Sequence, residues 1–290
     1  MSHDLKMAAR KKWKKILYED QGVPDNYVDS SFLDEMKKNL YTRTYSYWSV
    51  VRNSGEVTQQ ISSLCLFVVA YIYMYNQKLS PRLLVIAMAA VTMVGYLVKL
   101  YTDHVIGIKG PHRTVLDDLK TAVIFTGFSF GLSPVLVSLT ETISTDTIYA
   151  MTTVMLLANL IFHDYGASAA MVSEALSLNA GIFASVCLAS RLHTTWHAFA
   201  TVTLSLLVFG LWPMLRKQMK KAIPGSQIGM TLTLCSVSIV ALVTVSAVAA
   251  VLGILLILFI TFVCPAWLIS LQPYKNNIYG PWDEAVIQTK

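Results

Sequence analysis

The feature that most constrains this chain is a run of 53 residues, 222–274, that contains no Asp, Glu, Lys, Arg or His. The hydrocarbon core of a bilayer is about 30 Å thick and takes roughly 20 helical residues per crossing. The run is therefore long enough for two crossings joined by a tight turn. Charged residues make up only 14% of the whole chain, well below their share in soluble domains. The chain is predicted to be embedded in a membrane.

Apolar segments of suitable length recur along the chain and predict an all-α, polytopic membrane helical bundle of about eight transmembrane helices. The predicted spans are 57–75, 82–101, 119–139, 147–162, 167–189, 195–215, 227–246 and 248–271. Residue types that favour helix starts precede several of them, namely Ser80 with Pro81, Thr145, Thr194 and Ser226. No Gly or Pro marks the boundary between the last two spans.

The distribution of basic residues predicts the orientation. With eight spans both termini lie on one side, and that side collects 20 of the 23 Lys and Arg residues. Only Lys78, Arg82 and Arg191 fall on the other side. Because loops rich in Lys and Arg stay in the cytosol, both termini are expected to be cytosolic. The predicted domains are a cytosolic N-terminal region over 1–56, a transmembrane domain over 57–271 and a cytosolic tail over 272–290.

The N-terminal region is expected to contain amphipathic, interfacial helices. Segment 10–17 places Trp13, Ile16 and Leu17 on one helical face below a basic one, as in helices that lie on an anionic membrane surface. The alternative is a solvated basic stretch that only sets the topology. Apolar residues recur near helical spacing over 32–51, which predicts a second helix that lies in the interface or packs on a partner.

Motifs for a reaction centre are absent from the sequence. No glycine-rich nucleotide-binding sequence occurs. His193 and His197 are four residues apart, yet no third metal ligand lies near them in sequence. The four cysteines all fall in predicted spans and form no C-x-x-C pair, as expected of small packing residues. We therefore expect no metal, no cofactor and no catalytic residue in this chain.

Two acidic positions remain as candidates. Glu174 lies about seven residues into the fifth predicted span, and an ionisable group at such depth is a functional candidate by default. Protonation, or a hydrogen bond to a neighbouring helix, would also account for it. Asp164 and Tyr165 lie in a predicted cytosolic elbow, 163–166. They either present a hydrogen-bonding cluster at the membrane surface or form a capped turn.

Basic residues flank the end of the sixth predicted span and are candidates for binding a lipid head group. They are Arg216, Lys217, Lys220 and Lys221. Clusters of this kind beside a transmembrane helix attract lipid phosphates. The alternative is that they only orient the protein in the membrane.

Several stretches, in the same order along nearly the whole chain, resemble one family. They are 17–19, 24–29, 47–48, 133–136, 139–141, 144–151, 164–166, 183–192 and 280–285. The two longest, STDTIYAM at 144–151 and FASVCLASRL at 183–192, are the most specific. The chain resembles the PIG-C family, which comprises the C subunits of phosphatidylinositol N-acetylglucosaminyltransferase.

That resemblance implies a multi-pass protein of the endoplasmic reticulum membrane. It implies a complex that transfers N-acetylglucosamine from UDP-N-acetylglucosamine to phosphatidylinositol, the first step of glycosylphosphatidylinositol (GPI) anchor biosynthesis. The implied partners are the catalytic A subunit, the H, P, Q and Y subunits, a dolichol-phosphate-mannose synthase regulatory subunit, and membrane lipid. No catalytic residue carries over, so the expected role is to scaffold the catalytic partner and to help present the lipid.

Two other functions remain open from the residues alone. One is a self-sufficient lipid transferase of the membrane, with Glu174 or Asp164 as its base. The other is a lipid transporter, although the sequence has no matching pair of Gly- or Pro-interrupted spans in its two halves.

Overall fold

The computed structural model describes residues 22, 27, 37–38, 45–107, 115–139, 142–166, 172–223, 225–274 and 278–279. The chain divides into two units, Ser46–Trp267 and a second unit formed by Met1–Tyr45 with Leu268–Lys290. In the second unit, strands β1 (Lys37–Lys38) and β2 (Ile278–Tyr279) form a short antiparallel pair.

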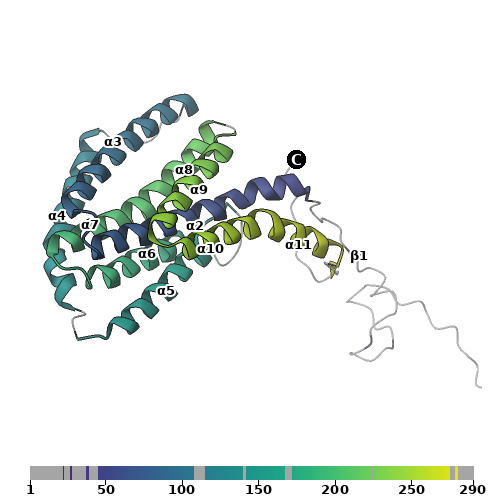
Figure 1. Cartoon of the computed structure of the whole chain (residues 1–290). Helices are drawn as coiled ribbons and strands as arrows, with labels where there is room; N and C mark the ends of the chain where they lie inside the picture. Colours follow the sequence, from purple (N-terminus) through teal and green to yellow (C-terminus); the bar gives the residue numbers. More distant parts are fainter. Residues whose placement is uncertain are drawn as a thin grey trace, which may run out of the picture. The chain divides into compact units, whose positions relative to one another are not determined.

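Apart from turns and short connections, the rest of the described chain is helical, which confirms the predicted all-α membrane bundle (Figure 1). The helical segments are α2 (Tyr47–Tyr75), α3 (Pro81–Ile106), α4 (Val115–Leu139), α5 (Thr145–Phe162), α6 (Glu174–Ala189), α7 (Thr195–Leu206), η1 (Leu207–Leu211), α8 (Trp212–Ala222), α9 (Ser226–Val245), α10 (Ala247–Leu258), η2 (Phe259–Val263), α11 (Cys264–Leu271) and η3 (Gln272–Tyr274).

Six of the described helices are long and apolar enough to cross a membrane. They are Tyr47–Tyr75, Pro81–Ile106, Thr145–Phe162, Thr195–Ala222, Ser226–Val245 and Ala247–Tyr274. Helix α6 is apolar but has only 16 residues, and the 25-residue α4 is not among the six. Six of the eight predicted spans overlap one helix each, and the spans 195–215 and 248–271 each overlap a continuous run of three helical segments, while the number of actual crossings stays a prediction.

Some helices begin at other residues than the predicted spans. Helix α2 begins at Tyr47, ten residues before the apolar span, and the ion pair of Glu56 with Lys220 lies in this added part. Helix α6 begins at Glu174 instead of 167, with Ser173 as its cap. At the predicted start of the seventh span, Gly225 occupies the N-cap position and Ser226 is already helical.

Of the two helices predicted in the N-terminal region, only the second falls partly within the described residues. Segment 10–17 lies outside the described residues. The helix predicted over 32–51 is wrong at Lys37–Lys38, which pair with Ile278–Tyr279 as strands, and correct from Tyr47 onward. Helical spacing along the chain carries no information about a partner more than 200 residues away, so the pairing was not visible in the sequence.

Side-chain caps start five of the described helices. Ser80, Ser144, Ser173, Thr194 and Ser246 each accept a hydrogen bond from the backbone N–H three residues later. Such caps satisfy one of the unpaired donors at a helix N-terminus. Ser246 also ends α9 in an extended conformation, so one residue makes the turn of the uncharged hairpin.

Two prolines account for the π-helical turns. Segment η1 comes just before Pro213, and η2 comes just before Pro265. Proline has no N–H, so the carbonyl one turn earlier loses its helical partner. A widened π turn absorbs this defect without breaking the helix.

Helix α2 is the centre of the unit Ser46–Trp267. It packs along α9 and contacts α5, α7 and η2 (Figure 1). Its Phe67 is fully buried and meets Phe209 edge to face, with ring centroids 5.2 Å apart. A Cβ added to Gly181 on α6 would lie 2.6 Å from the Phe209 ring, so only glycine fits beneath it.

Contacts between helix ends show which ends lie together. Glu56 near the start of α2 pairs with Lys220 at the end of α8. At the opposite end of α2, the Tyr75 carbonyl lies 3.3 Å from Nε2 of His193, in the turn between α6 and α7. The start of α2 and the end of α8 therefore lie together, away from the end of α2 at Tyr75.

Candidate functional site at the charged rim

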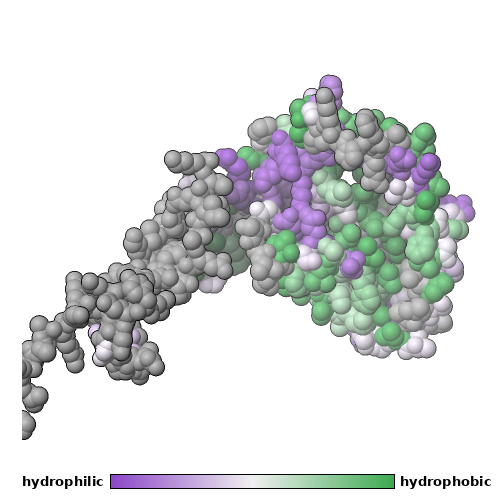
Figure 2. All heavy atoms as spheres, turned by 180° about the vertical axis from the view of Figure 1, so that it is seen from behind, coloured by the Kyte–Doolittle hydropathy of each residue, from purple (hydrophilic) through white to green (hydrophobic). Residues whose placement is uncertain are grey.

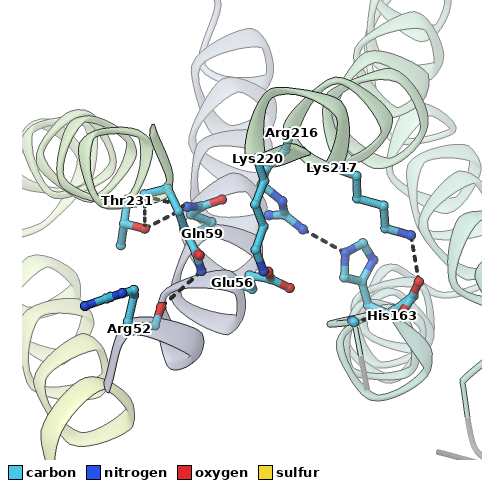
Figure 3. Close-up of polar contacts among 11 residues, drawn as sticks. Arg52, Glu56, Gln59, His163, Arg216, Lys217, Lys220 and Thr231 are labelled. Carbon is cyan, nitrogen blue, oxygen red and sulfur yellow. Dashed lines mark hydrogen bonds and ion pairs between the residues drawn. The ribbon is translucent and has the colours of Figure 1, made fainter. Parts of the chain in front are cut away.

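Seven side chains are joined by ion pairs and hydrogen bonds where α2, the α5–α6 connection, α6 and α8 meet, and five of them are labelled in Figure 3. We call these residues the rim cluster: Glu56, His163, Asp164, Glu174, Arg216, Lys217 and Lys220. In the space-filling view, hydrophilic side chains gather in a patch near one end of this unit, next to a broad hydrophobic surface (Figure 2).

Helix α8 supplies the cations of the rim cluster. Nζ of Lys217 lies 2.8 Å from Oδ2 of Asp164 and also pairs with the carboxylate of Glu174. One turn later, Lys220 pairs with Glu56 of α2. One face of α8 is thereby joined to three other parts of the fold.

The pair of Arg216 and His163 is buried beneath these ion pairs. Nη2 of Arg216 lies 2.9 Å from Nε2 of His163. Arginine only donates hydrogen bonds, so Nε2 must be the unprotonated acceptor and the imidazole is neutral. Burial, followed by the nearby charges of Arg216 and Lys217, lowers the pKa of His163 to about 4.

The connection that follows α5 holds Asp164 in place. Its Oδ1 accepts a hydrogen bond of 2.8 Å from the backbone N–H of Gly166, whose φ of +78° suits glycine. Hydrogen bonds from Lys217 and Gly166 lower the pKa of the Asp164 carboxyl. Tyr165 donates to the Leu160 carbonyl at 2.7 Å, and burial raises its pKa to about 12.

A line of polar residues continues from the rim cluster into the bundle along α2. Nε2 of Gln59 donates to Oγ1 of Thr231 on α9 at 2.6 Å, and Nε2 of Gln60 donates to Oδ1 of Asn159 on α5 at 2.9 Å. Together with Glu56, these side chains stand at i, i+3 and i+4 and so share one side of the helix. Through Glu56, Gln59 and Gln60, helix α2 thus bonds to α8, α9 and α5 in that order.

A cavity of about 20 Å³ lies within this arrangement. Five members of the rim cluster line it, together with Gln59, Gln227 and Met230. Those five are Glu56, Asp164, Arg216, Lys217 and Lys220. The cavity therefore joins the charged rim to the polar side of α2.

The structure brings most of the predicted site residues together and changes the environment of some. Glu174 is the first residue of α6 and its side chain is exposed, so the predicted depth, counted from 167, does not apply. Tyr165 bonds back to the end of α5. Lys221 is exposed in the last turn of α8.

Two of the site residues, Glu56 and Gln59, were not predicted from the sequence, because they fall at the edge of the first predicted span. The spacing of polar residues along α2 is the signal that points to them. His163 belongs to the predicted elbow, 163–166, for which a hydrogen-bonding cluster was one of two expectations, but its bond to Arg216 was not predicted. Within the rim cluster the carboxylates of three residues balance three cations, so the predicted basic surface is largely charge-compensated.

The described residues include no group of three or more His, Cys, Asp or Glu side chains arranged to hold a metal ion. Nδ1 of His197 lies 2.7 Å from Oγ1 of its own cap, Thr194. His193 is stacked on Tyr75, with ring centroids 6.0 Å apart. All four cysteines are free thiols.

These observations define a polytopic α-helical membrane protein with a polar, charge-balanced rim. A sequence model of the family described as GPI2, phosphatidylinositol N-acetylglucosaminyltransferase, matches residues 13–283. The chain belongs to this family, as its motifs indicated.

Curated relatives agree with the assignment. The chain is 50% identical to the C subunit of phosphatidylinositol N-acetylglucosaminyltransferase of Homo sapiens, over 96% of this chain and 93% of the human protein. It is 39% identical to the putative C subunit of Dictyostelium discoideum, over 95% and 80% of the two chains. It is 34% identical to the GPI2 subunit of Schizosaccharomyces pombe, over 96% and 87%. No solved structure matches the chain.

Proposed function

We propose that this chain is a non-catalytic membrane subunit of a complex that transfers N-acetylglucosamine from UDP-N-acetylglucosamine to phosphatidylinositol, the first step of GPI-anchor biosynthesis. The observation that carries the proposal is the similarity, over 96% of the chain, to relatives named as the C subunit of this transferase. The word subunit in those names also supports assembly with other chains. We propose the endoplasmic reticulum membrane as its location, with both termini in the cytosol.

The proposed partners are the catalytic A subunit, the H, P, Q and Y subunits, and the dolichol-phosphate-mannose synthase regulatory subunit. The proposed domain plan keeps 1–56 and 272–290 on the cytosolic side of a transmembrane domain, 57–271. In that arrangement the rim cluster faces the cytosol, where the sugar donor is found. The chain would hold its catalytic partner at this rim and help present the lipid.

The state of the carboxylates supports a non-catalytic role. A general base works best when its pKa lies near the working pH. Asp164 is bound to Lys217 and its pKa is lowered further below that range. Glu174 is bound to the same lysine. Neither suits the self-sufficient transferase considered from the sequence.

For lipid presentation we propose that the phosphate of phosphatidylinositol approaches the exposed end of α8. The side chains of Lys217 and Lys220 are 36% and 46% exposed. Lys221 adds a further exposed cation in the same turn. Their outer surfaces, with Arg216, Asp164 and Tyr165 behind them, form the proposed head-group site.

The test is reconstitution in nanodiscs that contain phosphatidylinositol. We expect sugar transfer from the complete complex and none from this chain alone. Asp164→Asn and Glu174→Gln complexes that assemble normally should turn over at the wild-type rate. Transfer of N-acetylglucosamine by the single chain, or loss of turnover in a normally assembled amide variant, would show that the chain itself is catalytic.

A further inference from the structure

Two buried polar atoms at the rim cavity have no partner among the described residues. Gln59 is fully buried, and its Oε1 accepts no hydrogen bond there. Arg216 is 4% exposed, and its Nη1 donates none there. Both residues line the same cavity of about 20 Å³. Two residues that line the same cavity therefore each lack one hydrogen bond, an acceptor bond at Gln59 and a donor bond at Arg216.

The orientation of both groups is determined by their other bonds. Nε2 of Gln59 donates to the carbonyl of Gln227 at 3.2 Å and to Oγ1 of Thr231 at 2.6 Å. The Thr231 hydroxyl donates in turn to the Gln227 carbonyl, so both atoms accept from Gln59. If the amide of Gln59 were flipped, its Oε1 would face two atoms that accept hydrogen bonds, the carbonyl oxygen of Gln227 and Oγ1 of Thr231. The bond from Nη2 to His163 likewise positions the guanidinium of Arg216.

We propose that this cavity binds a single hydroxyl group, which donates to Oε1 of Gln59 and accepts from Nη1 of Arg216. A hydroxyl is the small group that both donates and accepts. A cavity needs about 10–15 Å³ of such space to hold one water molecule. The cavity of about 20 Å³ therefore fits one hydroxyl-sized group.

The same geometry disfavours a phosphate in the cavity. An ionised phosphate ester only accepts hydrogen bonds and would leave Oε1 of Gln59 facing another acceptor. Glu56 and Asp164 also line the cavity and would repel an anion. A phosphate group is in addition larger than the space. The hydroxyl site thus differs in chemistry from the exposed lysines above it.

Two sources can supply the hydroxyl. One is water, held as an internal part of the fold. The other is a ring hydroxyl of the lipid head group, which rests on the proposed function because it needs phosphatidylinositol as the substrate. The partly exposed side chains of Lys217 and Lys220 border the cavity, so the site is close to the surface where a head group would lie.

The test is a pair of electron cryomicroscopy maps of the complete complex at a resolution that resolves water. One complex is in nanodiscs with phosphatidylinositol and the other in phosphatidylserine nanodiscs, which carry the same lipid charge without a polyol. We expect density within about 3.2 Å of both atoms. An isolated peak in both maps identifies water, and density continuous with a ring only in the first identifies the lipid. An empty cavity, or a protein carboxylate directly on Nη1, overturns the proposal.

A pair of variants tests whether Oε1 of Gln59 accepts the hydrogen bond from the bound hydroxyl. Gln59→Met keeps the length of the side chain and removes Oε1, so the density should be lost from the cavity. Gln60→Met is the matched control, because Gln60 is equally buried and does not line the cavity. Unchanged density in the Gln59→Met complex would overturn the assignment, and if that variant fails to assemble the wild-type maps decide. Sugar transfer by the wild-type complex tests the proposed function separately.

Discussion

Helix α2 and the segment Ala247–Tyr274 are nearly equal in length but differ in what they bury. They contain 29 and 28 residues, and the most apolar window of each has a mean hydropathy of 1.5 and 3.0. In α2, 56% of that window is buried inside the protein, against 6% in the more apolar segment. The less apolar helix is therefore the one at the centre.

This inversion follows from the membrane as a solvent. Lipid tails are as apolar as leucine, so apolar side chains gain little by turning inward, whereas polar groups need partners from other helices. Gln59 and Gln60 of α2 find such partners on α9 and α5. The outer segment carries an open apolar groove instead, lined by Leu255, Leu256, Leu258, Phe259, Phe262 and Val263.

The largest expected difference is in the response to pH, and it separates the rim cluster, which includes the start of α2, from the uncharged segment Ala247–Tyr274. An unfolded histidine titrates near 6.5, whereas the buried His163 titrates at about 4. Stability contributed by the neutral ring is thus complete above pH 6.5 and is lost as the pH falls towards 4, by up to about 3 kcal/mol. Thermal unfolding of the purified chain in detergent, followed from pH 7 to 4.5, measures this slope.

His163→Gln keeps an acceptor for Arg216 and should flatten the slope. Leu252→Ala, at an exposed position of α10, is the control, because the uncharged segment has no group that titrates in this range. It should leave the slope unchanged. A slope of wild-type size in His163→Gln would mean that other groups, such as the carboxylates of the rim cluster, cause it.

The sequence predicted those parts of the fold that depend on local composition. The eight apolar segments and the caps at Ser80 and Thr194 needed only hydropathy and capping types, and the structure has them. The basic residues of α8 were also visible. Their pairing with Asp164, Glu174 and Glu56 was not, because it depends on which helices meet.

The start of α2 shows the same limit. Hydropathy alone begins the span at 57, because Arg52 and Glu56 resemble loop residues. In the fold, the Arg52 carbonyl accepts from Gln227 and Glu56 pairs with Lys220, so the helix continues through both. Long-range partners decide where a polar helix end stops, and a single sequence does not reveal them.

The second test compares glycines in the two regions. Gly181→Ala puts a methyl group 2.6 Å from the Phe209 ring, in the buried core around α2. A ring held by its neighbours moves little, so we expect a loss of about 2 kcal/mol in the free energy of unfolding. Denaturation of the purified variants in mixed micelles measures it.

Gly253→Ala on α10 is the matched control. Its new methyl group would lie 2.8 Å from Cδ1 of Leu242, the far end of a flexible side chain. Rotation of that side chain and the better helix propensity of alanine should keep the change below about 0.5 kcal/mol. Equal losses at the two positions would show that the core around α2 is no more tightly packed than the outer hairpin.

The third test removes a polar partner of α2. Asn159→Leu leaves Gln60 without its acceptor and removes the bonds to Ser177, which Nδ2 of Asn159 makes at 2.8 and 3.0 Å. A loss of about 1–2 kcal/mol is expected for buried groups left unpaired between membrane helices. Thr153→Val on the exposed side of α5 breaks only a local bond to Tyr149 and should be nearly neutral. If both variants unfold alike, the polar contacts of α2 do not hold the bundle together.

The smallest effect is expected at the solvent-exposed ion pairs of Lys217. Lys217→Met removes two ion pairs at once, but its side chain is 36% exposed and Glu174 is 70% exposed. Solvent screens such pairs, so we expect a loss of about 0.5 kcal/mol at low salt that shrinks as ionic strength rises. Lys221→Met, at an exposed cation one turn further along the same helix, should leave stability unchanged at every salt concentration. A loss in Lys217→Met that persists at 1 M salt would place this part of the rim with the buried side of α2, because buried pairs are screened far less than exposed ones.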